Sequence, residues 1–213
     1  MIRIKICGIT SREDAVRAAG LGAWAIGVIL APESPRRVDL EQAAGITEAV
    51  PPGVGRFGVF VNADVEEIAE AVSRCGLTGV QMHGEESPEQ CLQVRRRAGV
   101  AVIKAIRVAG GDLMASVVRF DTDLVLLDTY HPERRGGTGV PFDWNLAAAL
   151  PEDIRRRLVL SGGLTPENVA EAVTRVSPFA VDVSSGIEER PGVKDPERMK
   201  KLFETLRQSQ GNR

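Results

Sequence analysis

A cysteine at the end of the first expected strand is the residue of this chain best placed for chemistry. Cys7 ends the apolar segment of residues 2–7, lies two residues after Lys5 and is followed directly by Gly8. Taken alone, such a cysteine is more often structural, but core cysteines tend to sit in mid-strand. The thiolate is the reactive form, and a cation such as Lys5 would lower the pKa of the thiol. We therefore treat Cys7 as a candidate catalytic residue.

Polar side chains also end three later apolar segments. They are His83, Asp128, Asp182 and Ser184. Residues two apart in a strand share a face, so all four are expected to point to the same side as Cys7. A register slip of one residue would reverse any single assignment. Asp182 could cap the turn at residues 184–187 or bind substrate, and His83 could be a hydrogen-bonded scaffold group or a proton shuttle.

The elements that must position these residues alternate along the whole chain. The expected strands are residues 2–7, 23–30, 56–61, 79–83, 101–105, 123–128, 158–161 and 179–184. The expected helices are residues 12–20, 40–49, 65–75, 88–98, 113–118, 144–150, 166–176 and 196–208. Strict alternation predicts a parallel sheet joined by right-handed crossovers.

Eight such units favour one closed (β/α)8 TIM barrel of the α/β class, because a flavodoxin-like sheet usually stops near five strands. We expect a single catalytic domain over residues 1–208 and a polar tail over residues 209–213. Barrel enzymes carry their active sites at the C-terminal ends of the strands, where Cys7 is expected. Lys5 and Lys104 are expected to form a polar floor inside the barrel, paired with inward acids.

Local signals mark several helix boundaries. Thr165 before Pro166 predicts a helix start with proline at the first helical position, as does Ser87 before Pro88. Helix ends are expected at three glycines, which are Gly20, Gly76 and Gly99.

Glycine-rich loops follow the last three expected strands, at residues 136–139, 161–164 and 184–187. Glycine lets backbone N–H groups approach an anion closely, and the loops after strands seven and eight of a barrel commonly hold phosphate. The candidate phosphate-binding residues are Gly162, Gly163, Ser184, Ser185 and Gly186. The pattern predicts a phosphorylated small molecule as substrate.

Composition argues against several classes of partner. The 213 residues carry a net charge of −2 and only 4% aromatic residues, which disfavours nucleic acid and anionic membrane surfaces. Neither a secretory leader nor a long uncharged apolar segment is expected, so no membrane partner is predicted. The three cysteines lie far apart, which argues against disulfides and structural zinc and favours a reducing cytoplasm. Cys75 and Cys91 are expected to be packing residues.

A series of motifs runs in order along nearly the whole chain. They are residues 5–10 (KICGIT), 34–38 (SPRRV), 58–62 (GVFVN), 81–85 (QMHGE), 126–129 (LLDT), 136–139 (GGTG), 142–144 (FDW), 160–164 (LSGGL), 180–188 (AVDVSSGIE) and 191–195 (PGVKD). Together they resemble the phosphoribosylanthranilate isomerase family, the (β/α)8 enzymes of tryptophan biosynthesis. Two departures are Met82, where the family usually has leucine, and residues 28–31, where it is rich in aromatics. The second departure could alter how the anthranilate ring is packed.

The resemblance implies the Amadori rearrangement of N-(5-phosphoribosyl)anthranilate to 1-(2-carboxyphenylamino)-1-deoxyribulose 5-phosphate, with no metal or organic cofactor. It assigns the general acid, which protonates the furanose oxygen, to Asp128. It assigns the general base, which removes the C2′ proton, to Cys7. Arg36 matches the family's arginine for the anthranilate carboxylate, and the glycine loops match its phosphate clamp. His83 and Asp182 are further substrate-binding candidates, and a homodimer is considered as the assembly.

Three other functions are weighed against this expectation. A ribulose-phosphate epimerase would need rim histidines as metal ligands, but the chain has only His83 and His131. The aminoaldose isomerase of histidine biosynthesis would use aspartate on the first strand, where this chain has Cys7. The third alternative is a non-catalytic barrel that binds phosphoribosyl ligands, and the presence of both Cys7 and Asp128 argues against it.

Overall fold

The computed structural model describes residues 2–108, 112–129 and 142–211, which form a closed barrel of eight parallel strands. The strands follow chain order and are β1 (Arg3–Cys7), β2 (Ala25–Ile29), β3 (Gly55–Phe60), β4 (Gly79–Met82), β5 (Ala101–Val108), β6 (Leu124–Thr129), β7 (Leu158–Leu160) and β8 (Ala180–Val183). The barrel closes where β8 pairs with β1, with Lys5 opposite Asp182. The predicted α/β barrel is confirmed.

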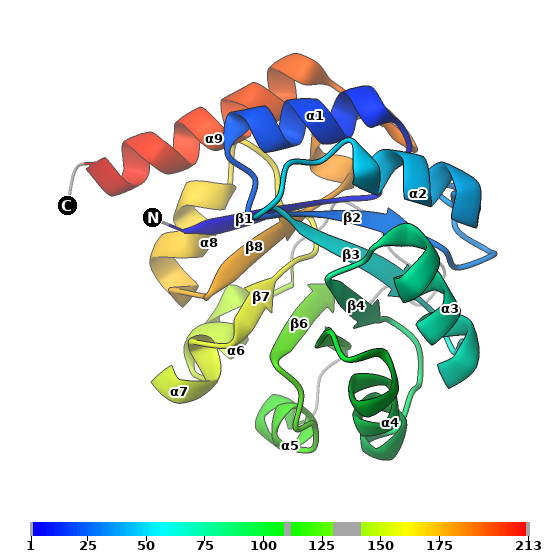
Figure 1. Cartoon of the computed structure of the whole chain (residues 1–213). Coiled ribbons are helices and arrows are strands. Elements are labelled where there is room, and N and C mark those ends of the chain that lie inside the picture. Colours follow the sequence, from blue (N-terminus) through cyan, green and yellow to red (C-terminus); the bar gives the residue numbers. More distant parts are fainter. Residues whose placement is uncertain (1, 109–111, 130–141, 212–213) are drawn as a thin grey trace.

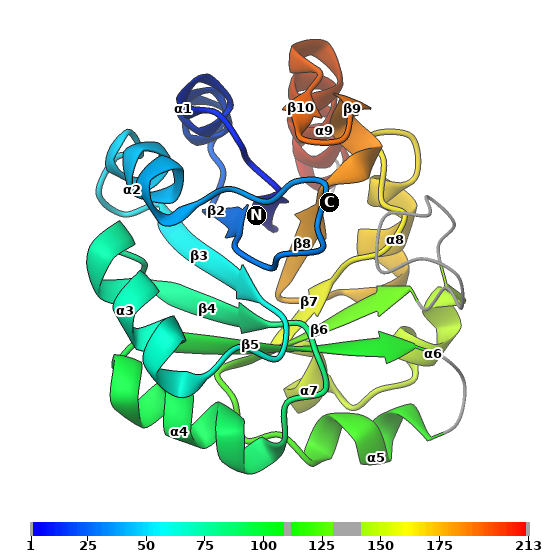
Figure 2. The ribbon, with the colours of Figure 1, turned by 90° about the vertical axis from the view of Figure 1, so that its right-hand side faces the viewer.

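Helices surround the strands, as Figures 1 and 2 show from two directions. They are α1 (Arg12–Leu21), α2 (Leu40–Glu48), α3 (Val65–Cys75), α4 (Pro88–Ala98), α5 (Leu113–Val118), α6 (Trp144–Ala148), α7 (Glu152–Arg155), α8 (Val169–Val176) and α9 (Pro196–Gly211). The bounds of α3, α4 and α5 are those that the sequence predicts. Ser87 caps α4 through a hydrogen bond from the Gln90 N–H, so this predicted helix start is confirmed.

Two predicted helix boundaries are wrong. Helix α1 runs past Gly20 and ends at Gly22, whose φ of 97° is accessible mainly to glycine and whose N–H bonds to carbonyls of the last turn. Helix α8 begins at Val169 rather than at Pro166. The reason is a turn closed by side chains, in which Asn168 Oδ1 accepts a hydrogen bond from the Thr165 N–H at 2.8 Å.

The C-terminal part of the chain holds three further differences. The helix expected over residues 144–150 is two helices, because α6 ends at Ala148 and Pro151 precedes the separate helix α7. The short helix η1 (Ser185–Ile187) leads into a hairpin of β9 (Glu188–Arg190) and β10 (Val193–Lys194), which the sequence did not predict. Residues 209–211, expected in a polar tail, continue α9.

Two apolar clusters divide the interior. The larger one lies between the outer face of the barrel and the helices, and it includes Ile4 and Ile6 of β1. The smaller one fills the bottom of the barrel with residues such as Phe57, Ile103 and Leu126. The predicted alternation of faces is therefore confirmed for β1 and β6. Because the bottom is apolar, polar side chains can gather only above it, toward the C-terminal ends of the strands.

Both predicted floor lysines are buried, but only one lies inside the barrel. Lys5 pairs with Asp182 at 2.9 Å, as the sequence suggested. Lys104 shares the outward face of β5 with Val102 and pairs with Glu86 at 2.7 Å, so its expected place in the floor is wrong. Strand β5 contributes Ile103 and Ala105 to the barrel interior instead.

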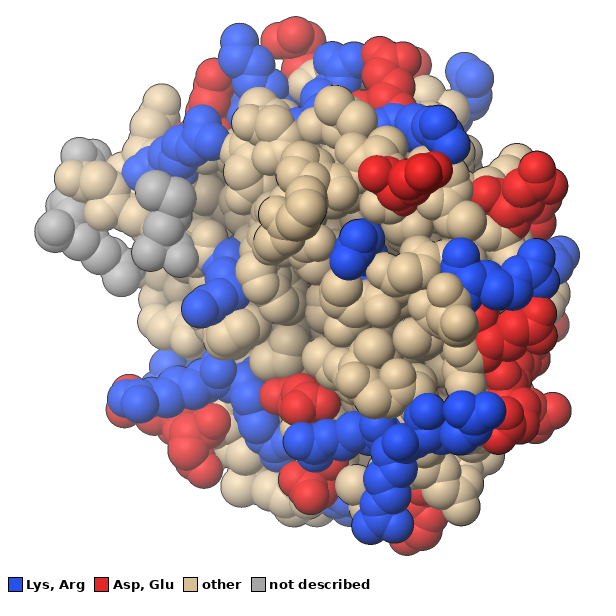
Figure 3. All heavy atoms as spheres, viewed as in Figure 1, with Lys and Arg blue, Asp and Glu red and all other residues tan. Residues whose placement is uncertain are grey.

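The surface carries charges of both signs. Figure 3 shows lysine and arginine side chains interspersed with aspartate and glutamate on one face, in keeping with the net charge of −2. Within residues 2–108, 112–129 and 142–211, no helix has both the length and the apolar character needed to cross a bilayer.

Two glycine-to-alanine substitutions should have opposite effects on stability. A Cβ at Gly79 in β4 would overlap the ring of Phe57, so we expect Gly79→Ala to lower the free energy of unfolding by about 1–3 kcal/mol. A Cβ at Gly20 in α1 would meet no atom within 4 Å, so Gly20→Ala should raise it by about 0.5–1 kcal/mol. Urea unfolding measures both, and a stabilising Gly79→Ala would contradict the packing of the barrel floor.

Candidate active site

A cavity of about 380 Å³ opens at the C-terminal ends of the barrel strands. The residues predicted for the site all line it, and they are Cys7, Arg36, His83, Asp128, Gly162, Gly163, Asp182, Ser184, Ser185 and Gly186. Residues that are distant in the sequence therefore share one chamber. The glycine-rich segment of residues 136–139 lies outside the described residues.

Beneath the cavity, the ammonium group of Lys5 binds three partners. It donates to Asp182 Oδ1 at 2.9 Å, to Gln81 Oε1 at 2.9 Å and to the sulfur of Cys7. An ammonium has three N–H donors and no acceptor, so its hydrogen-bonding capacity is filled. Burial alone would lower the pKa of Lys5, but Asp182 and Cys7 outweigh it and the pKa lies above its ordinary value. Lys5 therefore remains charged beneath the thiol.

The pKa of the Cys7 thiol differs from what the nearby Lys5 suggested in the sequence. Burial raises the pKa of Cys7, and the nearby carboxylate of Asp182 raises it further. Lys5 and Lys194 act in the opposite direction and do not compensate fully. The expectation that Lys5 would lower the pKa of Cys7 below its ordinary value is therefore wrong. The main reason is burial of the thiol, and the second is Asp182, which lies 177 residues from Lys5 in the chain and pairs with it.

The carboxyl group of Asp128 lies on the β6 side of the same cavity and is nearly buried. Its Oδ1 accepts a hydrogen bond from the Thr129 N–H at 2.9 Å, and its Oδ2 lies 3.2 Å from Nε2 of His83. Nδ1 of His83 in turn lies 2.8 Å from Nε2 of Gln81. His83 thus contacts Gln81 through one ring nitrogen and, through the other, the carboxyl group expected to be the acid.

Asp182 has a different partner from the one considered for it. The short helix η1 has no side-chain cap, so Asp182 does not cap this turn. Instead its carboxylate holds Lys5, and the side chain still borders the cavity. A contact between Asp182 and a substrate is therefore compatible with its position.

Arg36 reaches the cavity from the loop after β2 and is held by Glu188. Nε and Nη2 of Arg36 lie 2.8 and 2.7 Å from the two carboxylate oxygens of Glu188, which is a bidentate contact. The hydrogen bonds to Glu188 raise the pKa of Arg36. This contact uses two of the five N–H donors of a guanidinium, and the others remain for a ligand carboxylate.

Lys194 completes this group from the hairpin after β8. Its ammonium lies 2.8 Å from Glu188 Oε1 and 3.2 Å from the carbonyl of Ser184. Burial lowers the pKa of Lys194, and Glu188 opposes that effect. Sequence reasoning missed Glu188 and Lys194 as site residues, although both lie in quoted motifs. The signal in the sequence that could have indicated them is the Pro191-Gly192 pair, a turn sequence with Glu188 before it and Lys194 after it.

The loops after β7 and β8 pack directly against each other. A Cβ at Gly186 would overlap the carbonyl oxygen of Leu164, and a Cβ at Gly162 would overlap Thr129. Gly162 also has a φ of 85°, which favours glycine. Glycine at 186 therefore lets the two loops approach each other, and glycine at 162 lets the loop after β7 approach the end of β6. Together with Ser184 and Ser185 these loops form one end of the cavity.

The other two cysteines are remote from this chemistry. Cys75 and Cys91 are buried in the layer between the barrel and the helices, as predicted for packing residues. Burial raises the pKa of Cys91 to about 11. Within the described part of the chain, no group of three or more His, Cys, Asp or Glu side chains is arranged to hold a metal ion.

Comparisons with known proteins agree in one family. The family model of N-(5'-phosphoribosyl)anthranilate isomerase matches residues 4–205. The N-(5'-phosphoribosyl)anthranilate isomerase of Citrifermentans bemidjiense is 48% identical over 203 residues, which cover 95% of this chain and 96% of the relative.

Two crystal structures extend the likeness to the fold. One is a phosphoribosylanthranilate isomerase in complex with reduced 1-(o-carboxyphenylamino)-1-deoxyribulose 5-phosphate, at a TM-score of 0.83 and 41% identity. It covers 98% of this chain and 100% of the other. The second shows monomers generated from the dimeric enzyme of Thermotoga maritima, at a TM-score of 0.84 and 40% identity. This second superposition covers 98% of this chain and 100% of the Thermotoga maritima chain.

The titration of Cys7 should show the effect of burial and of Asp182. In a background carrying Cys75→Ala and Cys91→Ala, we expect the thiolate absorbance of Cys7 to rise with a midpoint above the ordinary thiol pKa of about 8.5. Asp182→Asn removes an anion that raises this pKa, so the midpoint should fall. An upward shift in Asp182→Asn, or a wild-type midpoint below the ordinary value, would contradict the arrangement of charges around Lys5.

Proposed function

Because the chain belongs to the N-(5'-phosphoribosyl)anthranilate isomerase family, we propose that Cys7 and Asp128 perform the proton transfers of that family's reaction. The reaction is the aldose–ketose isomerisation of N-(5'-phosphoribosyl)anthranilate in tryptophan biosynthesis. One observation supports the assignment above all. The thiol of Cys7 on β1 and the carboxyl of Asp128 on β6 border the same cavity, at a rim built for one small molecule.

In the proposed mechanism, Asp128 donates its proton to the furanose ring oxygen. The C1′–O bond breaks, and the nitrogen lone pair forms the C1′ iminium. The thiolate of Cys7 then removes the proton from C2′, and the electrons of that bond move to form an enolamine. Tautomerisation of the enolamine gives the aminoketose product. The acid loses one proton and the base gains one, so the pair needs no redox partner.

The charges beneath Cys7 explain how a buried thiol can serve as base. Burial and Asp182 raise the pKa of Cys7, so its thiolate, the form that acts, binds a proton more tightly than an ordinary thiolate does. Lys5 and Lys194 both stabilise the thiolate once it forms, since each lowers the pKa that burial raises. A thiolate in this setting is poorly solvated, and it gains strength as a base from its high pKa.

The remaining contacts are proposed from the geometry of the rim. Arg36, oriented by Glu188, would bind the anthranilate carboxylate with its remaining N–H groups. The loops containing Gly162, Gly163 and residues 184–186 would bind the phosphate through backbone N–H groups. The related structure with the reduced product analogue, itself a 5-phosphate, supports a phosphorylated ligand. Asp182 and His83 would contact the substrate between these two ends.

Three further properties complete the proposal. We infer that residues 1–208 form one catalytic domain, because a single barrel accounts for the whole described chain. A homodimer is proposed on the precedent of the dimeric relative from Thermotoga maritima. Action in the reducing cytoplasm is proposed because all three cysteines are free. That the reaction proceeds without metal or cofactor stays a prediction.

The two catalytic assignments predict losses in kcat. Cys7→Ala and Asp128→Asn should each lower kcat by about 10²–10⁴-fold with little change in KM, because each removes one proton-transfer group and leaves the binding groups in place. Steady-state turnover, followed as the loss of substrate fluorescence, measures both. Cys91→Ala, the same substitution at a packing cysteine, should keep normal turnover. Normal kcat in either active-site variant would refute that residue's role.

The proposed carboxylate contact predicts a different kinetic effect. Arg36→Ala should raise KM by about 10–100-fold, which corresponds to the loss of about 1.5–3 kcal/mol from a charge-assisted hydrogen bond. Arg37→Ala is the matched control, because Arg37 is exposed and lies next to Arg36. An unchanged KM in Arg36→Ala would place the anthranilate carboxylate elsewhere in the cavity.

A further inference from the structure

A continuous line of hydrogen bonds joins the two sides of the cavity. Lys5 on β1 donates to Gln81 on β4 at 2.9 Å, and Gln81 lies 2.8 Å from His83. His83 lies 3.2 Å from Asp128 at the end of β6. Gln81 is 1% exposed, and its side chain lies in the middle of this line. In the sequence, Gln81 opens the motif of residues 81–85, but no role was assigned to it.

The orientation of the Gln81 amide follows from its neighbour on β1. The ammonium of Lys5 has donors only, so it must face the amide oxygen. The amide NH2 group, which also has donors only, therefore faces Nδ1 of His83. A contact between the two nitrogens at 2.8 Å requires Nδ1 to accept, so Nδ1 carries no proton. The charge on Lys5 thus determines, through Gln81, which ring nitrogen of His83 carries the proton.

The consequence falls on the other ring nitrogen. A neutral imidazole without a proton on Nδ1 carries it on Nε2, and Nε2 faces Oδ2 of Asp128. His83 is then a donor to Oδ2 of Asp128. The other tautomer would set an N–H of His83 against the NH2 of Gln81 and a bare nitrogen against Asp128. Both contacts would then be lost.

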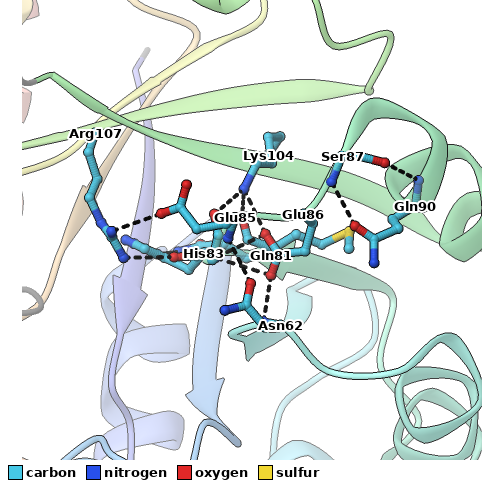
Figure 4. Close-up of polar contacts among 11 residues, drawn as sticks. Asn62, Gln81, His83, Glu85, Glu86, Ser87, Gln90, Lys104 and Arg107 are labelled. Carbon is cyan, nitrogen blue, oxygen red and sulfur yellow. Dashed lines mark hydrogen bonds and ion pairs between the residues drawn. The ribbon is translucent and has the colours of Figure 1, made fainter.

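The backbone of His83 is held independently of this line. Glu86 accepts hydrogen bonds from the Gly84 N–H and from the buried Lys104 ammonium, at 2.9 and 2.7 Å. Lys104 also donates to the Gly84 carbonyl, and Arg107 to the His83 carbonyl. Figure 4 shows these contacts around the end of β4. These contacts hold the backbone at His83 without Gln81, whereas Gln81 contacts the ring itself.

We propose that Gln81 is a positioning residue that holds His83 in the Nε2–H tautomer, so that His83 stabilises the carboxylate of Asp128 as it forms. The inference rests on the proposed role of Asp128 as general acid. When Asp128 transfers its proton to the sugar, negative charge develops on its oxygens. A preoriented N–H at Oδ2 stabilises that charge without reorganisation. Gln81 contributes to turnover through His83.

Nitrogen NMR tests the tautomer directly. The chain has only two histidines, so ¹⁵N-histidine labelling gives two ring systems, and His131→Gln assigns them. We expect His83 to be Nε2–H in the wild type at neutral pH. Gln81→Glu places a carboxylate against Nδ1, so Nδ1 should become protonated. Gln81→Met removes the amide without adding charge, so a mixture of tautomers is expected, and this variant carries the test if Gln81→Glu does not fold.

Kinetics on the same variants separates the positioning role from a structural one. In Gln81→Met we expect kcat to fall by about 10²-fold with KM nearly unchanged, as for the loss of one donor to a developing charge. Gln90→Glu is the matched control for Gln81→Glu, because Gln90 lies in the capping box of α4, where glutamate serves equally. It should leave the His83 resonances and kcat unchanged.

The outcomes distinguish this inference from the proposed function. A wild-type His83 protonated on Nδ1, or one that stays purely Nε2–H in both Gln81 variants, overturns the role of Gln81. Normal kcat in Gln81→Met with an altered tautomer overturns it as well, since the tautomer would not matter to turnover. Full activity of Asp128→Asn, together with a changed His83 tautomer in the Gln81 variants, would instead refute the acid role of Asp128. The control of the His83 tautomer by Gln81 would then still hold.

Discussion

The buried ammonium of Lys5 is the interaction on which the active site depends. A lysine without contact to water must be charged and paired or lose its proton, and here Asp182, Gln81 and Cys7 share its three donors. These partners come from β8, β4 and β1, so one cation fixes three strands of the barrel relative to one another. The same cation stabilises the thiolate at Cys7. One charge therefore both connects the strands and acts on the thiol.

The apolar bottom of the barrel explains why polar groups gather at one end. Residues such as Phe57, Ile103 and Leu126 fill the lower layers, where an unpaired charge would be costly. Above them the strands contribute shorter or polar side chains, and the cavity of about 380 Å³ begins. Polar groups on different strands thus meet in one cavity at the C-terminal ends of the strands.

A second group of charges holds Arg36 at the rim of the cavity. Glu188 accepts from both Arg36 and Lys194, so the loop after β2 and the hairpin of β9 and β10 are tied together through one acid. Glu188 remains ionised because these two cations offset its burial, and its pKa lies below the ordinary value. Through this contact the hairpin, which lies outside the barrel, determines where the Arg36 guanidinium points.

The sequence by itself determined the alternation of eight strands and helices and the inward direction of Cys7, His83 and Asp128, because side-chain periodicity and local caps are properties of short segments. It also pointed to the rim, since strand ends and glycine loops are visible in order. Only the tertiary structure decided the charge state of the site. Lys5 lies only two residues before Cys7, yet its strongest partner, Asp182, is 177 residues away, and burial raises the pKa of the thiol that the local pattern suggested would fall. Lys104 illustrates the same limit, since its partner Glu86 became visible only when β4 and β5 were placed side by side. Burial and long-range pairing depend on the closed barrel, and no local pattern contains them.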